Sequence, residues 1–341
     1  MSFYDKLSPA NVAPLWRARG LLPKEPSTPA VPFLWPYAEV RELLLEAGGV
    51  VTAEEAERRV LMLMNPGLDG RPAATANLYA GLQLVLPGEI APMHRHSAAA
   101  LRLICEGSGA YTAVDGEKAT MEVGDLVLTP SWTWHDHGNE TDEPMIWLDG
   151  LDLPLLHKLE THFFEVTGDA RQALTVPENL SARLYASARM NPSWVDASTP
   201  YSPVIAFPWK QVERQLAEAA TVSDGTPADG LLFEYVNPFT GGPVMPTLSC
   251  HMQLLKPGLH TDAHRHTSAA VYHVVRGNGH SIVGGERLEW TARDTFALPA
   301  WAVHEHVNAS GDEDAVLFSF SDEPVVRSLG LHREQAVERQ G

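Results

Sequence analysis

Two histidines at alternating positions, His94 and His96, have the spacing of a metal-binding pair. Side chains alternate between the two faces of a β-strand, so a His-x-His pair on a strand points both imidazoles to the same side. His135, five residues after Pro130, supplies a third imidazole at the end of a later strand-like run. Three converging imidazoles suit zinc, iron, copper, nickel or manganese. An isolated His-x-His is more often an ordinary structural or surface pair, because nothing forces its ring nitrogens onto a metal.

An internal repeat strengthens the metal hypothesis. Residues 81–139 align with residues 251–308, and the glycines and prolines keep the same spacing in both copies. Eight of the fifteen histidines fall at matched positions of the repeat. Such self-similarity indicates gene duplication and two lobes of one fold. We therefore predict a metal site on His94, His96 and His135, and we leave open whether His264, His266 and His304 bind a second ion.

The elements that must position these histidines are predicted to be short strands. Runs rich in β-branched and aliphatic residues, separated by Gly and Pro, indicate a sandwich or barrel. A Pro-rich segment with helical stretches precedes them, and residues 209–220 have a helical pattern between the copies. The predicted strands are residues 82–86, 101–104, 111–114 and 126–129. The predicted organisation is an N-terminal helical arm (1–76), a first, metal-binding lobe (77–165), a helical connector (166–245), a second lobe (246–325) and a C-terminal tail (326–341).

Composition narrows the possible partners. The chain has 341 residues, of which 25 are Lys or Arg and 43 are Asp or Glu, for a formal charge of −18. This balance disfavours nucleic acid and anionic membranes, and no apolar stretch is long enough for a membrane span. Only Cys105 and Cys250 occur, and the N-terminus lacks the pattern of a signal peptide, so we expect a cytoplasmic protein. An anionic small substrate must then be bound by individually placed arginines.

The histidines belong to two longer patterns, Gly88-x5-His94-x-His96 and Gly124-x5-Pro130-x4-His135-x3-Asn139. These resemble the two cupin motifs, and the resemblance implies a mainly β bicupin made of two double-stranded β-helix (jelly-roll) barrels. The glutamate that many cupins place after His-x-His is absent, since residues 97–101 read SAAAL. The inner sphere would then be three neutral histidines, which leaves up to three coordination positions on one side of the metal.

Four further segments carry a narrower resemblance: LPGEIAPMHRH (86–96), VDGE (114–117), GDLVLTPSWTWHDH (124–137) and WLDGLD (147–152). Together they resemble gentisate 1,2-dioxygenases. That resemblance implies Fe(II) as cofactor, an aromatic carboxylate and O2 as substrates, ring opening between C1 and C2 to maleylpyruvate, and a homotetramer. Salicylate and 1-hydroxy-2-naphthoate dioxygenases share nearly all of these motifs, so they remain alternatives. A non-oxidative bicupin, either an isomerase or a ligand-binding protein, is the alternative from another class.

Positions where the two copies differ suggest which lobe is catalytic. Arg102 in the first copy becomes Tyr272 in the second. An arginine six residues after His96 shares its face of the strand if the strand continues, and it could bind a carboxylate through two hydrogen bonds. Asp149 is predicted to align with Phe318, which would make it a polar group that only the first lobe keeps. Surface placement remains the alternative for Arg102, and a turn aspartate for Asp149.

The remaining candidates are weaker. His137 lies two residues after His135, and the resemblance implies that this position assists substrate deprotonation or orients oxygen; a structural histidine is the alternative. Gln83 could hydrogen-bond substrate or oxygen, although Gln253 is retained in the other copy, which suggests a partly structural role. Arg58 and Arg59 could close the site over an anionic ring, but helical arginines more often face solvent.

Overall fold

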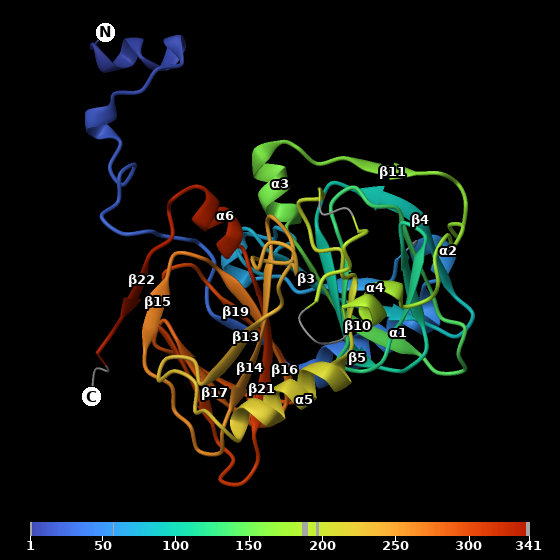
Figure 1. Cartoon of the computed structure of the whole chain (residues 1–341). Coiled ribbons are helices and arrows are strands. Elements are labelled where there is room, and N and C mark those ends of the chain that lie inside the picture. The colour runs from blue at the N-terminus through green and yellow to red at the C-terminus, as the bar shows by residue number, and fades with distance from the viewer. Residues whose placement is uncertain (1, 57, 186–189, 196–197, 339–341) are drawn as a thin grey trace.

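The computed structural model describes residues 2–56, 58–185, 190–195 and 198–338 and consists of two β-rich lobes (Figure 1). The first lobe is built from two antiparallel sheets with the strand orders β12-β8-β5-β10-β3-β2 and β11-β4-β9-β6-β7. Its strands are β2 (Val60–Met62), β3 (Tyr79–Val85), β4 (Ile90–His96), β5 (Ala100–Glu106), β6 (Tyr111–Val114), β7 (Glu117–Thr120), β8 (Leu126–Thr129), β9 (His135–Gly138), β10 (Met145–Leu151), β11 (Phe164–Val166) and β12 (Ala206–Phe207).

The second lobe repeats this plan, with the strand orders β1-β19-β16-β21-β14-β13 and β18-β17-β20-β15-β22. Its strands are β1 (Phe33–Trp35), β13 (Leu231–Glu234), β14 (Ser249–Leu255), β15 (His264–His266), β16 (Ala270–Arg276), β17 (Asn278–Val283), β18 (Glu286–Thr291), β19 (Thr295–Leu298), β20 (His304–Asn308), β21 (Ala315–Ser321) and β22 (Glu334–Ala336). The prediction of a mainly β protein with two barrels is confirmed, and each of the four predicted strands is present as β3, β5, β6 or β8.

The helices lie around and between the lobes. They are α1 (Tyr37–Val50), α2 (Ala53–Ala56), α3 (Leu153–Leu159), α4 (Leu180–Leu184), α5 (Trp209–Ala220) and α6 (Glu323–Ser328), with 3-10 turns at Tyr4–Lys6, Ser8–Ala10, Leu15–Arg17 and Pro66–Leu68. Thr52 caps the N-terminus of α2, because the Glu55 amide donates to the Thr52 hydroxyl at 3.1 Å. None of the helices in the described ranges is long and apolar enough to cross a membrane.

Equivalent aspartates of the two repeats fasten helices to the lobes. The Asp125 carboxylate accepts from the amide of Trp209, the first residue of α5, at 2.7 Å. The Asp294 carboxylate accepts in the same way from the amide of Tyr37, the first residue of α1, at 2.8 Å. A carboxylate at a helix N-terminus satisfies a free amide and interacts favourably with the helix dipole. The duplicated aspartate is therefore a structural residue in both copies.

Several pairings cross the predicted segment boundaries. β1 lies in the arm but pairs with β19 of the second lobe, while β2 pairs with β3 of the first. β22 lies in the predicted tail but pairs with β15. The apolar core is likewise shared, since one cluster contains Leu82 and Leu148 of the first lobe together with Met252 and Phe318 of the second. The arm and tail thus complete sheets.

Candidate metal centre and active site

The strands of the first lobe bring four histidines together inside the barrel. His94 on β4 lies directly opposite His135 on β9, and their ring centres are 4.1 Å apart. The ring centre of His96 is 4.8 Å from that of His135, and His137 lies 5.6 Å from it. The period-two alternation of β4 and β9 therefore has the predicted effect, because residues two apart on each strand face the same interior.

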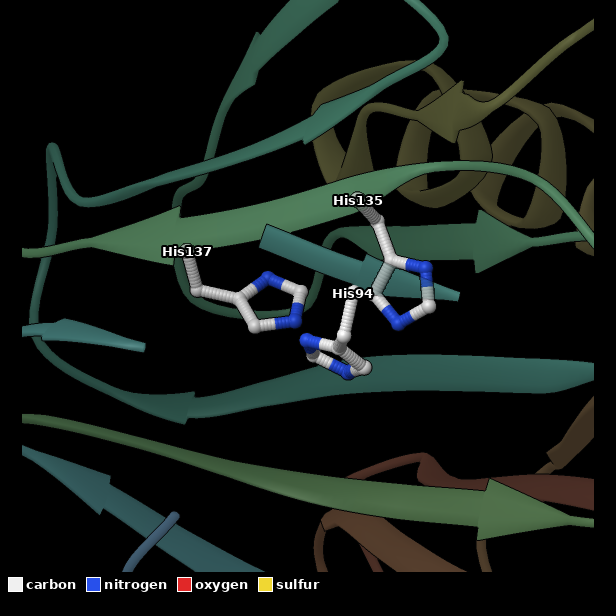
Figure 2. A group of neighbouring side chains, drawn as sticks. All are labelled: His94, His135 and His137. Atoms are coloured by element: carbon white, nitrogen blue, oxygen red, sulfur yellow. The ribbon is translucent and has the colours of Figure 1, made fainter. Parts of the chain in front are cut away.

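His137 forms a second possible ligand group with two of the predicted ligands. One ring nitrogen from each of His94, His135 and His137 lies within 4.8 Å of the others. Figure 2 shows these three rings turned toward one another from neighbouring strands. The ring centre of His96 is 5.7 Å from that of His94, and the ring centre of His137 is 6.2 Å from it. The assignment of His96 as the third ligand thus stays a prediction, with His137 as its rival.

Hydrogen bonds at the rings set the orientation of the three predicted ligands. Each Nδ1 lies 2.7–2.9 Å from a main-chain carbonyl oxygen two residues away, so that Nδ1 donates and Nε2 keeps its lone pair. The Nε2 atoms of His135 and His137 are buried without a hydrogen-bond partner among the described residues. Buried polar atoms rarely go unpaired, so the cluster fits a divalent transition-metal ion that takes these lone pairs.

The electrostatic environment keeps these imidazoles neutral. Burial, with the nearby Arg58 charge, lowers the pKa of His94 to about 3, and burial lowers the pKa of His96 to about 4. Burial also holds the pKa of His135 and of His137 well below the ordinary value. Because a metal binds the deprotonated ring, the site is in its ligating form at neutral pH.

Arg102 and Asp149 form a buried pair beside the histidines. They are cross-strand neighbours on β5 and β10, and Arg102 Nε lies 3.4 Å from Asp149 Oδ1. Arg102 also donates to the Thr129 hydroxyl, and Trp147 Nε1 donates to Asp149 Oδ1 at 3.1 Å. Burial raises the pKa of Asp149 to about 6 despite the opposing effect of Arg102. Both residues lie inside the barrel, not on the surface or in a turn.

The predicted equivalence of Asp149 and Phe318 is wrong. Asp149 pairs with Arg102, and the residue that pairs with Tyr272, the equivalent of Arg102, is Ser319. Phe318 instead pairs with His273, one position away. A shift of one residue moves a side chain to the other face of a strand, which explains the apolar side chain at 318. The second lobe therefore keeps a polar, though uncharged, group at this place.

Arg58 reaches the histidine cluster, whereas Arg59 does not. Arg58 Nη1 lies 3.1 Å from His94 Nε2. Arg59 is only 6% exposed and makes two hydrogen bonds to the Glu89 carboxylate, at 2.8 and 3.0 Å, and further bonds to a main-chain oxygen. The two adjacent arginines thus differ in role. Arg58 lines the site, and Arg59 makes structural hydrogen bonds.

Two residues of β3 line the same region. Gln83 is buried, and its Nε2 has no hydrogen-bond partner in the described part of the chain. Tyr79, which the sequence reasoning missed, lies near Arg58 and Asp149, and burial raises the pKa of its hydroxyl. A Cβ on Gly81 would lie 2.8 Å from the Tyr79 hydroxyl, so glycine there leaves room for it. Residues 79, 81 and 83 share one face of β3, so the even spacing of Tyr79 from Gln83 could have indicated that Tyr79 faces the site.

Comparisons with known proteins agree with this architecture. The cupin domain model matches residues 81–151 and 251–321. The "Gentisate 1,2 dioxygenase 1" of Aquipseudomonas alcaligenes is 44% identical over 333 residues, which cover 97% of this chain and 95% of the relative. The 5-aminosalicylate 1,2-dioxygenase of Comamonas sp. is 42% identical over 345 residues, covering 100% of this chain and 91% of the relative.

A solved structure extends the likeness to three dimensions. The crystal structure of a salicylate 1,2-dioxygenase from Pseudoaminobacter salicylatoxidans, in an adduct with gentisate, has a TM-score of 0.92 at 34% identity. The match covers 98% of this chain and 93% of that one. The cupin model matches both lobes, and the relatives are similar over nearly the whole chain. The chain therefore belongs to the gentisate 1,2-dioxygenase family of ring-cleaving bicupin enzymes.

Proposed function

We propose that the first lobe opens gentisate between C1 and C2 with O2 to give maleylpyruvate. The observation that carries this proposal is the buried Arg102 guanidinium beside the histidine cluster, in the lobe that also has Arg58 at His94. Two positive groups in a largely water-excluded site favour an anionic ring substrate. The 44% identity to a gentisate 1,2-dioxygenase supports the choice of ring.

We propose Fe(II) as the metal and His94, His96 and His135 as its ligands. Their uniform Nδ1 hydrogen bonds support this set of ligands, because all three rings present Nε2 in the same way. Bound there, Fe(II) would supply the redox-active centre through which the ring and O2 react. His94 Nε2 would then coordinate the metal and no longer accept from Arg58 Nη1. Arg58 Nη1 would therefore be free to contact the substrate.

The protein groups have separate tasks in this proposal. Arg102 binds the substrate carboxylate, while Asp149 and Thr129 hold its guanidinium in place. His137 takes the proton of a ring hydroxyl at Nε2, while its Nδ1, 2.9 Å from the Thr112 hydroxyl oxygen, donates to that oxygen before and after the transfer. Gln83 Nε2 has no partner among the described residues and is the hydrogen-bond donor for substrate or oxygen.

A salicylate-type ring is the second candidate substrate. It is favoured by the 42% identity to a 5-aminosalicylate 1,2-dioxygenase and by the structural match to a salicylate 1,2-dioxygenase. A 1-hydroxy-2-naphthoate ring remains the larger alternative. All of these substrates carry a hydroxyl next to the carboxylate, so Arg102 and the metal would serve them equally. Family membership leaves the non-oxidative bicupin without support.

A cytoplasmic homotetramer is part of the same proposal. The two cysteines are free and buried, which suits a reducing compartment. Residues 2–22 extend away from both lobes (Figure 1) and expose large apolar side chains, among them Trp16 at 72% and Leu22 at 86%. Exposed apolar groups of this kind favour contact with another subunit. Sedimentation of the full chain tests the oligomeric state.

The decisive experiment is O2 uptake by anaerobically purified, Fe(II)-loaded protein given gentisate, with the product identified by mass. We expect one O2 consumed per ring opened, and loss of uptake in His135→Ala. Salicylate and 1-hydroxy-2-naphthoate are tested in parallel to rank the rings. Full iron loading without uptake on any of the three would contradict the proposal.

A further inference from the structure

The second lobe reproduces the histidine geometry of the first. The ring centres of His264 and His304 are 4.1 Å apart, those of His266 and His304 are 4.9 Å apart, and those of His264 and His266 are 6.0 Å apart. The corresponding distances in the first lobe are 4.1, 4.8 and 5.7 Å. One ring nitrogen from each residue lies within 4.8 Å of the others. Three imidazoles therefore converge here as closely as in the candidate active site.

The rings are also held in the ligating orientation. Each Nδ1 lies 2.9–3.3 Å from a main-chain carbonyl oxygen two residues away, which are those of Asp262, Ser268 and Ala302. A ring that donates from Nδ1 to a fixed carbonyl has its lone pair on Nε2. Such outer hydrogen bonds fix the tautomer and rotation of metal-binding histidines. Duplication has preserved these supports together with the histidines.

The charge next to the first histidine of each pair differs between the lobes. Asp229 Oδ1 lies 3.8 Å from His264 Nε2, whereas Arg58 Nη1 lies 3.1 Å from His94 Nε2. The two segments occupy equivalent places, since the strands that follow them, β13 and β2, pair alike with β14 and β3. A guanidinium in one lobe is thus replaced by a carboxylate in the other.

Local hydrogen bonds position the Asp229 carboxylate. Its Oδ2 accepts from the Thr226 hydroxyl at 3.1 Å, and its main-chain oxygen accepts from Gln253 Nε2 at 2.7 Å. The turn itself is closed by reciprocal main-chain bonds between Thr226 and Gly230, at 2.9 and 2.8 Å. The carboxylate is therefore presented to His264 by a closed turn. A carboxylate oxygen beside imidazole nitrogens is a common fourth ligand for divalent metals.

The cavity at this cluster is unsuited to an anionic ring. It has a volume of about 350 Å³, and its lining includes the carboxylates Glu234, Glu323 and Glu334 in addition to Asp229. The one arginine of that lining, Arg327, is an ion-pair partner of Glu323. Tyr272 stands where the first lobe has Arg102, and its ring packs 4.9 Å from that of His306. Negative charges favour a cation and repel an aromatic carboxylate.

We propose that the second lobe binds its own divalent transition-metal ion through His264, His266 and His304, with Asp229 as a fourth, anionic ligand. The bound ion offsets part of the negative charge of the cavity and ties the turn at 226–230 to β15 and β20. The aromatic carboxylate substrate does not bind at this ion.

The test counts ions and does not depend on ring cleavage. Full-length protein is stripped with a chelator, reloaded with Co(II) and desalted, and cobalt per chain is measured by mass spectrometry. We expect two ions in the wild type, one in His304→Ala, one in His135→Ala and none in the double variant. The visible spectrum of the remaining ion in His135→Ala reports the coordination of the second site alone.

Asp229→Asn tests the fourth ligand without removing a histidine. We expect the Kd of the second-lobe ion to rise roughly 10-fold or more, as when a carboxylate that supports a metal site is lost. Glu234→Gln is the matched control, because it makes the same charge change in the same cavity. Wild-type protein that holds one ion, lost in His135→Ala and kept in His304→Ala, would overturn the metal site. Equal effects of the two carboxylate variants would overturn the role of Asp229.

Discussion

The two lobes hold their histidines alike and surround them differently. Matching ring-centre distances agree within 0.3 Å, yet the first lobe places Arg58 and Arg102 at the cluster, and the second places Asp229 and Tyr272 there. Strand pairing sets the histidine geometry, since His94 lies opposite His135 as His264 lies opposite His304. The side chains around the histidines differ between the lobes, because they can change without disturbing the strand pairing.

The largest expected effects on kcat are those of His96→Asn and His137→Asn, which should distinguish a metal ligand from a proton acceptor. We expect His96→Asn to lose the metal of the first lobe and about 1000-fold or more in kcat, since the metal centre contributes several kcal/mol to the transition state. His137→Asn should keep the metal while kcat falls about 100-fold, the usual scale for a general acid-base group. Metal content and O2 uptake distinguish the two. The opposite pattern of metal loss would make His137 the third ligand.

Removing the charge of Arg102 should make the first lobe bind the aromatic carboxylate poorly, as we expect of the second lobe. We expect Arg102→Met to raise the KM for gentisate about 100-fold, because a charge-assisted hydrogen-bonded contact with the carboxylate contributes about 3 kcal/mol. The steady-state rate of O2 uptake measures this, and unchanged metal content is the control. Tyr272→Phe is the matched variant of the other lobe and should leave KM within about twofold. An unaltered KM in Arg102→Met would place the carboxylate elsewhere.

The adjacent arginines of the arm should fail in different ways. We expect Arg58→Ala to lower kcat/KM about 10-fold at unchanged stability, because Arg58 faces the cluster and is only half-buried. Arg59→Ala should instead lower the free energy of unfolding by about 3 kcal/mol, since it leaves Glu89 without its buried partner. Urea unfolding and initial rates together test the pair. Loss of activity without loss of stability in Arg59→Ala would contradict this division.

The smallest expected effect is a pH dependence that comes from Asp149, where the second lobe has the non-titrating Ser319 at the equivalent position. The pKa of Asp149 is raised from 3.8 to about 6 in the folded protein, so the folded state binds its proton more tightly than the unfolded state. This contribution to stability is fully present below pH 3.8 and is lost as pH rises through about 6. Between pH 7 and pH 5, the free energy of unfolding of wild type should therefore rise by about 1 kcal/mol relative to Asp149→Asn.

Urea unfolding of both proteins at the two pH values measures that difference. The Ser319→Ala variant of the second lobe serves as the control and should show the pH dependence of wild type. A difference between wild type and Asp149→Asn that stays constant from pH 7 to pH 5 would mean that Asp149 does not titrate in this range.

The duplicated motifs were sufficient to predict two cupin barrels, the histidine cluster and the interior position of Arg102. For the histidines they were sufficient because strand alternation is local, so His94 and His96, two residues apart on β4, share a face. Arg102 faces the same interior for another reason, since the strand ends at His96 and Arg102 lies on β5 of the opposite sheet. The same reasoning failed for Asp149 and Phe318, where one residue of register in a distant strand decided the equivalence.

Only the tertiary structure decided which distant segments complete each site. Arg58 lies before β2 and Asp229 before β13, and nothing local to either residue indicates the histidine that it approaches. The pairing of β1 with the second lobe and the closeness of His137 to His94 depend likewise on long-range contacts. Such contacts arise from the packing of whole sheets and helices, which short-range sequence patterns do not encode.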